Sequence, residues 1–367
     1  MPYPAYQSRM QAINPFKQFH FQPARAAVLS LALLFALPAL TRAHPAWGIV
    51  VAPEGTVYFS DTERNRIWML TTNGRLRTIA AKQHTHGLYL AADGYLYGEA
   101  VEYDAKAQRW LAGRWRARSD DVFEETLLPT ANVPAGLGIC RDAQGNTYDV
   151  EQTDQLARVM KRTPAGEVSV LAGGTLGYAD CVRGVARFSF LEAMTLGPDG
   201  MLYLRDNDTI RRVTLDGEVL TIGGNPLGNE PHPMTGGLLG LAADERGNVY
   251  VADLAARCIR KIHADNHANH RVETIWQSSW MWTPSGVAVQ NGEVYVLENL
   301  AQTPWAVFGA LGMGPYTRVF RMSANGAVVK LTTVWGTTTS RVLGVLILLI
   351  ALYSLWRLRR KDTGHAV

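Results

Sequence analysis

The stretch Leu171–Val213, LAGGTLGYADCVRGVARFSFLEAMTLGPDGMLYLRDNDTIRRV, contains one full copy of a unit that recurs along most of the chain. A short apolar run is followed by a Pro-Asp-Gly turn at 198–200, a second apolar run at 201–204, an acid at Asp206 and a third run at 210–213. Asp-Gly supplies the positive φ angles that tight turns between antiparallel strands require. The stretch therefore predicts consecutive β-hairpins.

The unit occurs six times. In every copy a tyrosine lies three residues after a turn glycine, at Gly55/Tyr58, Gly94/Tyr97, Gly145/Tyr148, Gly200/Tyr203, Gly247/Tyr250 and Gly292/Tyr295. Five copies place an acid three residues after the tyrosine, at Asp61, Glu151, Asp206, Asp253 and Glu298, whereas the second copy carries Glu99 and Glu102 out of phase. Successive tyrosines are 39 to 55 residues apart, which is the length of a four-stranded blade. Six such units predict an all-β, six-bladed β-propeller over residues 44–334, because a propeller tolerates loops of unequal length at its faces.

Both ends of the chain are typical of membrane-directed segments. Residues 1–25 carry basic residues and no acid, and the apolar run 26–40 follows, so residues 1–43 are predicted to be a signal peptide or signal anchor. After a short linker at 335–341, the apolar segment 342–356 is a predicted transmembrane helix, and the basic tail 357–367 fits the positive-inside rule. We therefore expect a single-pass membrane protein with its propeller outside the cytoplasm, either periplasmic or extracellular.

The charge of the propeller differs from that of the whole chain, whose formal net charge is +4. Residues 44–340 hold 27 Lys and Arg against 31 Asp and Glu. The basic excess therefore belongs to the segments that flank the membrane, and nucleic acid is not an expected partner. Three cysteines are too few for a disulfide framework, and Cys140 and Cys258 fall on predicted strands, where a small buried apolar residue is expected.

Several phrases of the chain resemble NHL repeats. They are DTERNRI at 61–67, AGG followed by GYAD at 172–180, and PDGMLYLRDN at 198–207. The likeness covers about residues 48–334, and the six-blade register is similar to the wider superfamily that includes gluconolactonase-like and paraoxonase-like lactonases. The resemblance implies the propeller fold. It leaves the activity open, since that superfamily includes hydrolases, lyases and binding propellers.

Residues that recur in every blade are expected to be structural, so a site is sought where one blade differs from the others. His86 precedes the first strand of the second blade and Glu192 that of the fourth, and we expect both to face the central channel as candidate ligand-binding residues. The resemblance implies a ring of Glu, Asn and Asp in lactonases. The matching positions here are Trp47, His86, Ala135, Glu192, Leu239 and Ser285. They supply few oxygen ligands, so whether a metal or another cofactor binds is left open.

Two further departures lie late in the chain. The segment 276–282, WQSSWMW, places Trp280 and Trp282 between the fifth and sixth blades, either as a plug over the channel or as anchors for a ligand. Segment 299–317 lengthens a loop of the sixth blade with apolar residues and glycines, as a flap, a lid or a contact with the bilayer.

Three functions remain as hypotheses. The first is a membrane-tethered binding module whose loop face takes a protein or a small extracellular ligand. The second is a metal-dependent hydrolase or lyase of the gluconolactonase type that acts through His86 and Glu192. The third is a structural module of a membrane complex that docks through segment 299–317.

Overall fold

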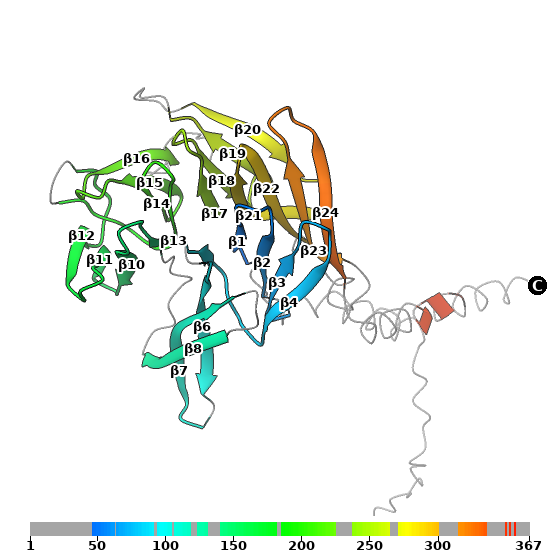
Figure 1. Cartoon of the computed structure of the whole chain (residues 1–367), viewed down its shortest axis with the longest axis horizontal. Coiled ribbons are helices and arrows are strands. Elements are labelled where there is room, and N and C mark those ends of the chain that lie inside the picture. Colours follow the sequence, from blue (N-terminus) through cyan, green and yellow to red (C-terminus); the bar gives the residue numbers. More distant parts are fainter. Residues whose placement is uncertain are drawn as a thin grey trace, which may run out of the picture.

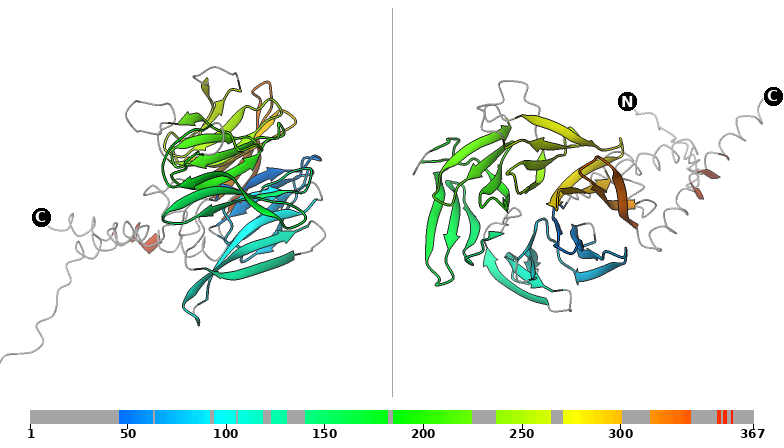
Figure 2. Two further views of the ribbon diagram at one scale, coloured as in Figure 1. Left: turned by 90° about the vertical axis from the view of Figure 1, so that its left-hand side faces the viewer. Right: turned by 45° about the horizontal axis from the view of Figure 1, so that its top comes forward.

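The computed structural model describes residues 46–62, 64–91, 94–104, 106–118, 123–130, 140–181, 185–224, 237–264, 271–300 and 315–335, together with 349, 350, 352, 353 and 356. Within these ranges the chain forms six antiparallel sheets of four strands each. The sheets are arranged around a central axis, as the second view of Figure 2 shows. The predicted all-β, six-bladed propeller is therefore confirmed (Figure 1).

Each blade consists of four consecutive strands. Blade one contains β1 to β4 (Ile49–Val51, Val57–Asp61, Arg66–Leu70, Leu76–Ala81), blade two β5 to β8 (Leu88–Leu90, Leu96–Asp104, Arg109–Ala117, Phe123–Thr130), and blade three β9 to β12 (Cys140–Arg141, Thr147–Gln152, Leu156–Arg162, Val168–Thr175). Blade four contains β13 to β16 (Leu191–Leu196, Leu202–Asp206, Thr209–Val213, Val219–Gly224), blade five β17 to β20 (Leu238–Ala243, Val249–Asp253, Cys258–Ile262, Val272–Gln277), and blade six β21 to β24 (Trp282–Gln290, Glu293–Leu300, Pro315–Met322, Val328–Trp335).

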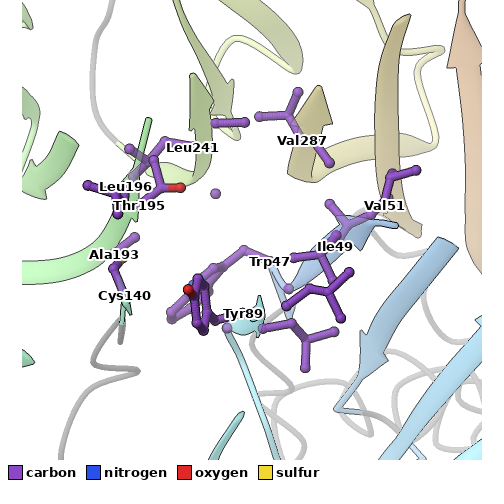
Figure 3. Close-up of a pocket in the computed structure, with 18 of the residues that line it drawn as sticks. Trp47, Ile49, Val51, Tyr89, Cys140, Ala193, Thr195, Leu196, Leu241 and Val287 are labelled. Atoms are coloured by element: carbon purple, nitrogen blue, oxygen red, sulfur yellow. The ribbon is translucent and has the colours of Figure 1, made fainter. Parts of the chain in front are cut away.

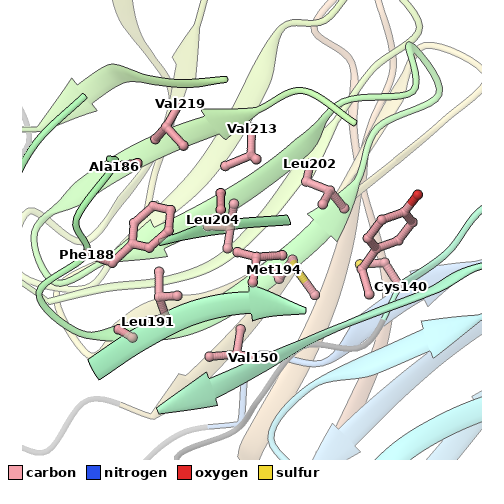
Figure 4. Packing of buried hydrophobic residues seen from close by; sticks show 14 residues of the cluster. Cys140, Val150, Ala186, Phe188, Leu191, Met194, Leu202, Leu204, Val213 and Val219 are labelled. Atoms are coloured by element: carbon pink, nitrogen blue, oxygen red, sulfur yellow. The ribbon is translucent and has the colours of Figure 1, made fainter. Parts of the chain in front are cut away.

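Apolar side chains between neighbouring blades form the core. The joint between blades three and four shows the arrangement: Cys140 and Val150 of one sheet lie beside Met194, Leu202 and Leu204 of the next (Figure 4). Strand periodicity explains it, because alternate residues of a strand point to opposite faces of a sheet, and in a propeller both faces of a blade meet a neighbour. Cys140 and Cys258 are buried on strands, as predicted, and all three cysteines are free thiols.

The repeated tyrosines are structural. Five of the six are buried, and Tyr203 donates a hydrogen bond from its hydroxyl to Asp199, an acid of the preceding turn, at 2.6 Å. Tyr148 and Tyr250 make the equivalent contact with Asp142 and Asp244 at 2.9 and 3.0 Å. In blades three, four and five the tyrosine thus ties the inner hairpin to the turn that precedes it.

The acids that follow the blade tyrosines by three residues, here called the in-phase acids, also have structural partners. Asp206 accepts hydrogen bonds from the backbone N–H groups of Ser189 and Phe190 at 2.7 and 2.8 Å, and it pairs with the buried guanidinium of Arg211 at 2.6 Å. Glu298 accepts a hydrogen bond from the Trp276 indole of blade five at 2.8 Å. These acids therefore stabilise single blades and the joints between them, as their repetition predicts.

The ring closes where blade one packs against blade six. Neither blade contributes a strand to the sheet of the other, because each sheet contains only its own four consecutive strands. Ile49, Val51 and Phe59 of blade one share a core with Ala288 and Leu297 of blade six. Gly286 allows the close approach, since a Cβ there would lie under 3.0 Å from the Trp47 carbonyl oxygen. Closure therefore depends on a glycine at the point where the two inner strands meet.

The two predicted membrane-directed segments lie largely outside the described residues. Of 342–356, the structure describes Leu349, Ile350, Leu352, Tyr353 and Trp356, all helical and exposed. Among the described residues, no helix has the length and apolar character needed to cross a membrane. The signal segment and the transmembrane helix stay predictions.

Candidate functional site

A cavity of about 670 Å³ lies at the centre of the ring. Every blade contributes to its wall, mainly through the innermost strands. Figure 3 shows Trp47, Thr195, Leu196, Leu241 and Val287, from four different blades, arranged around one common space. Its volume falls within the range of about 300–1,000 Å³ that is usual for small-molecule sites.

The wall of this cavity is mostly apolar. Its side chains include Ile49 and Val51 of β1, Leu241 of β17 and Val287 of β21, and stretches of glycine backbone complete it. Gly48, Gly87 and Gly240 lie in this wall, and at Gly48 and Gly240 the inner strands approach so closely that a Cβ would lie within 3.0 Å of neighbouring atoms. The lining residues that the structure describes include no Lys, Arg or His, and their single carboxylate is Glu99.

Glu99 is the acid by which blade two departs from the repeat. In the other five blades the acid follows the tyrosine by three residues, whereas Glu99 follows Tyr97 by two. The residues at the same offset in the other blades do not line the cavity, so the offset alone does not bring Glu99 to the channel; they are Ser60, Val150, Arg205, Ala252 and Leu297. Glu99 lines the cavity and is only 8% exposed.

Backbone groups at the entry to β5 hold the Glu99 carboxylate. Its Oε1 accepts hydrogen bonds from the backbone N–H groups of His86 and Gly87, the latter at 2.8 Å. Gly87 has no side chain, and a Cβ placed on it would lie 3.6 Å from Glu99 Oε2 and 3.4 Å from Nε1 of the Trp47 indole. A carboxylate oxygen and an indole N–H thus flank the same gap in the channel wall.

His86 lies behind this pair and is absent from the cavity lining. Its imidazole stacks on Trp47 with ring centroids 4.9 Å apart, meets the His84 ring edge-on at 4.9 Å, and places Nδ1 3.5 Å from Glu99 Oε1. His86 therefore positions the indole and the carboxylate that border the channel.

Glu192 occupies a different environment from His86. It forms an ion pair with Arg205, whose buried guanidinium also donates a hydrogen bond to the carbonyl oxygen of Leu238 in blade five. Burial lowers the pKa of Arg205, and Glu192 acts in the opposite direction. The Glu192 contacts thus belong to the joint between blades four and five.

The structure therefore places His86 and Glu192 in separate groups of contacts, and neither lines the cavity. Within the part of the chain that the structure describes, no three His, Cys, Asp or Glu side chains gather closely enough to hold a metal ion. Ala135, one of the positions matched to the lactonase ring, lies outside the described residues.

The two candidate tryptophans differ in exposure. Trp282 begins β21, is 4% exposed and packs beneath the guanidinium of Arg318, 4.0 Å from the ring centroid. Trp280 is 57% exposed, and its carbonyl oxygen accepts a hydrogen bond from Arg257 at 2.6 Å. Trp282 is therefore buried in the propeller body, and Trp280 has the exposure that a ligand anchor needs; the choice between plug and anchors stays a prediction. Residues 301–314, most of the predicted flap, lie outside the described residues.

Glu99 stands out in the sequence because it is out of phase with the acids of the other blades, which marks blade two as different. Its place in the channel wall depends on packing, which the repeat does not show. Trp47 occupies one of the positions matched to the lactonase ring, but the sequence does not show that its indole lies beside Glu99.

Comparison with solved structures supports the fold. A protein of unknown function from Bacteroides caccae is 13% identical, covers 79% of this chain and 96% of its own, and superposes with a TM-score of 0.50. A streptogramin B lyase is 17% identical over 79% of this chain and 83% of its own, with a TM-score of 0.46. A gluconolactonase from Xanthomonas campestris is 12% identical over 69% of this chain and 83% of its own, with a TM-score of 0.45.

At such identities the likeness concerns the fold alone. No protein-family model matches the chain. No curated protein matches it either. The six-bladed architecture is thus shown, whereas the assignment to NHL repeats stays a prediction that the architecture is compatible with.

Proposed function

We propose that this protein is a binding propeller, tethered to a membrane and facing away from the cytoplasm, that takes a small molecule into its central channel. The cavity of about 670 Å³ carries the proposal. The tether rests on the apolar segments 26–40 and 342–356 and on the basic residues beside them.

The composition of the cavity wall supports binding. Small-molecule sites are concave and mainly apolar, with a few polar groups that fix the ligand's orientation. Here apolar side chains form most of the wall, and Glu99, Thr195 and Gln290 are among its few polar side chains. A wall formed from β-sheets that share cores with their neighbours is preformed, so little conformational entropy is lost when a ligand enters.

A small molecule fits the described residues better than a protein partner does. Protein interfaces depend on exposed aromatic or Arg anchors at their centre. Of the two tryptophans considered as anchors, Trp282 is buried under Arg318 and only Trp280 is exposed. The channel is a concave feature of the described residues, and its volume suits a small ligand.

The test is to fill the channel. We expect Thr195→Trp to abolish small-molecule binding by the full chain in lipid nanodiscs, measured by saturation-transfer NMR against a chemically diverse set of compounds. Ala242→Phe fills the same cavity from blade five and should have the same effect. Val168→Trp, on the exposed outer strand β12, is the control that should retain binding.

Circular dichroism and thermal unfolding establish that these variants fold. If no compound binds the wild type, or if both filling variants bind as well as the wild type does, the channel is not the ligand site.

A further inference from the structure

We infer that the ligand of the channel is an apolar molecule carrying a protonated amine, which hydrogen-bonds to Glu99 at the gap left by Gly87. The inference rests on the proposed function and specifies its ligand class. It starts from the charge of the cavity: the described lining has one carboxylate and no basic side chain.

The electrostatics of the wall favour a cation. An anionic ligand would meet Glu99 without a basic side chain in the lining to compensate for the repulsion. A carboxylate only accepts hydrogen bonds, so the ligand group beside it must donate one. Hydrogen bonds between an ammonium group and a carboxylate are charge-assisted and stronger than those between neutral groups. The acidic excess of residues 44–340 acts in the same direction by attracting cations to the propeller.

The geometry leaves an oxygen for this contact. Oε1 is engaged by the N–H groups of His86 and Gly87, whereas Oε2 borders the space where Gly87 lacks a side chain. Among the described residues, no hydrogen bond to Oε2 is present. Burial of a charged group is costly unless it is paired, so a donor from the ligand would stabilise this carboxylate.

Aromatic rings form part of the same cavity wall, and Trp47 borders the gap itself. The Trp47 indole lines the cavity on one side, and Tyr89 and Tyr97 line it from blade two. The faces of aromatic rings attract cations, and Trp does so most strongly. Tyr89 is held in place because its hydroxyl donates a hydrogen bond to the Arg141 carbonyl oxygen at 2.7 Å.

The remaining wall requires an apolar body. Beyond the Glu99 gap the channel is bordered by Ile49, Val51, Leu241 and Val287, which gain free energy by removing apolar ligand surface from water. A free metal ion fits poorly, because Ca²⁺ or Mg²⁺ needs several oxygen ligands and this wall offers one carboxylate.

Three compounds with one skeleton test the inference. Adamantylamine, adamantanol and adamantane carboxylate share their apolar body and differ in charge. We expect the full-length protein in neutral phosphatidylcholine nanodiscs to bind the amine at least about tenfold more tightly than the alcohol, because hydrogen bonds to charged groups contribute more. The carboxylate should bind more weakly than both, and empty nanodiscs correct for partition into lipid.

The variant Glu99→Gln removes the charge and keeps an oxygen for the backbone N–H groups. We expect it to bring the affinities for amine and alcohol to within about twofold of each other. Glu151→Gln is the matched control, because Glu151 is the in-phase acid of blade three, is exposed and lies outside the cavity lining. It should keep the wild-type preference.

The outcomes separate the two proposals. If the wild type binds amine and alcohol equally and Thr195→Trp abolishes both, the channel binds ligands and the amine inference is overturned. If none of the three compounds binds, the channel function fails for this class, and the inference with it. The comparison within the wild type decides the matter even if Glu99→Gln does not fold.

Discussion

The substitution Gly286→Ala tests how the ring closes, and we expect it to destabilise the contact between blades one and six. A Cβ at this position would lie under 3.0 Å from the Trp47 carbonyl oxygen and 3.0 Å from Cγ2 of Ile49, closer than a relaxed structure allows. The oxygen belongs to the backbone, so no change of rotamer relieves the contact, and the inner strands of blades one and six must separate. Overpacking of a well-packed core costs about 1–3 kcal/mol, and we expect a loss near the upper end of that range because backbone has to move.

For a domain of this size, such a loss corresponds to a decrease in the unfolding temperature of roughly 5 °C. Thermal unfolding followed by tryptophan fluorescence measures it. Gly174→Ala is the control: Gly174 lies on β12, a methyl group added there would meet no other atom within 4 Å, and the position does not need a positive φ angle. That variant should unfold at the wild-type temperature or slightly above it. A Gly286→Ala protein as stable as the control would refute the account of ring closure.

Three further predictions concern buried groups. Arg211→Met should lower the free energy of unfolding in urea by about 3–5 kcal/mol, because it leaves the buried Asp206 without its ion-pair partner. The control Arg158→Met removes a partly exposed ion pair and should lower the free energy of unfolding by under about 1 kcal/mol. Equal losses in the two variants would contradict this prediction. Burial, and then the hydrogen bond to Asp142, raises the pKa of Tyr148 to about 12 from 10.0. The folded state thus holds this proton more tightly than the unfolded chain, so stability should fall as the pH rises from about 10 towards 12, and less steeply in Tyr148→Phe; identical pH profiles would rule this out. A thiol reagent should modify one cysteine of the native protein, the partly exposed Cys181, and all three cysteines after denaturation. The other two are buried, and burial raises the pKa of the Cys140 thiol to about 12, so little reactive thiolate forms. Rapid reaction of a second thiol in the native protein would count against the fold.

The sequence determined the architecture because the propeller is encoded locally. The first hairpin of every blade carries a turn glycine with a tyrosine three residues later, so the repeat could be read without knowledge of distant contacts. The positions Tyr203 and Asp206 predicted structural roles, and the structure shows both in hydrogen bonds that stabilise blade four. Blade number and strand order followed from the same repeat.

Only the tertiary structure decided which side chains meet. The sequence predicts that His86 and Glu192 both precede inner strands, but in the structure His86 precedes β5 and Glu192 lies within β13. One stacks on Trp47 and the other pairs with Arg205, because the contacts of each depend on how its own blade packs against the next. Glu99 lines the channel, whereas the residues at the same offset in the other blades do not, so the packing around Gly87 and Trp47 decides its place. Local patterns therefore specify blades, whereas the content of the channel depends on how six blades converge.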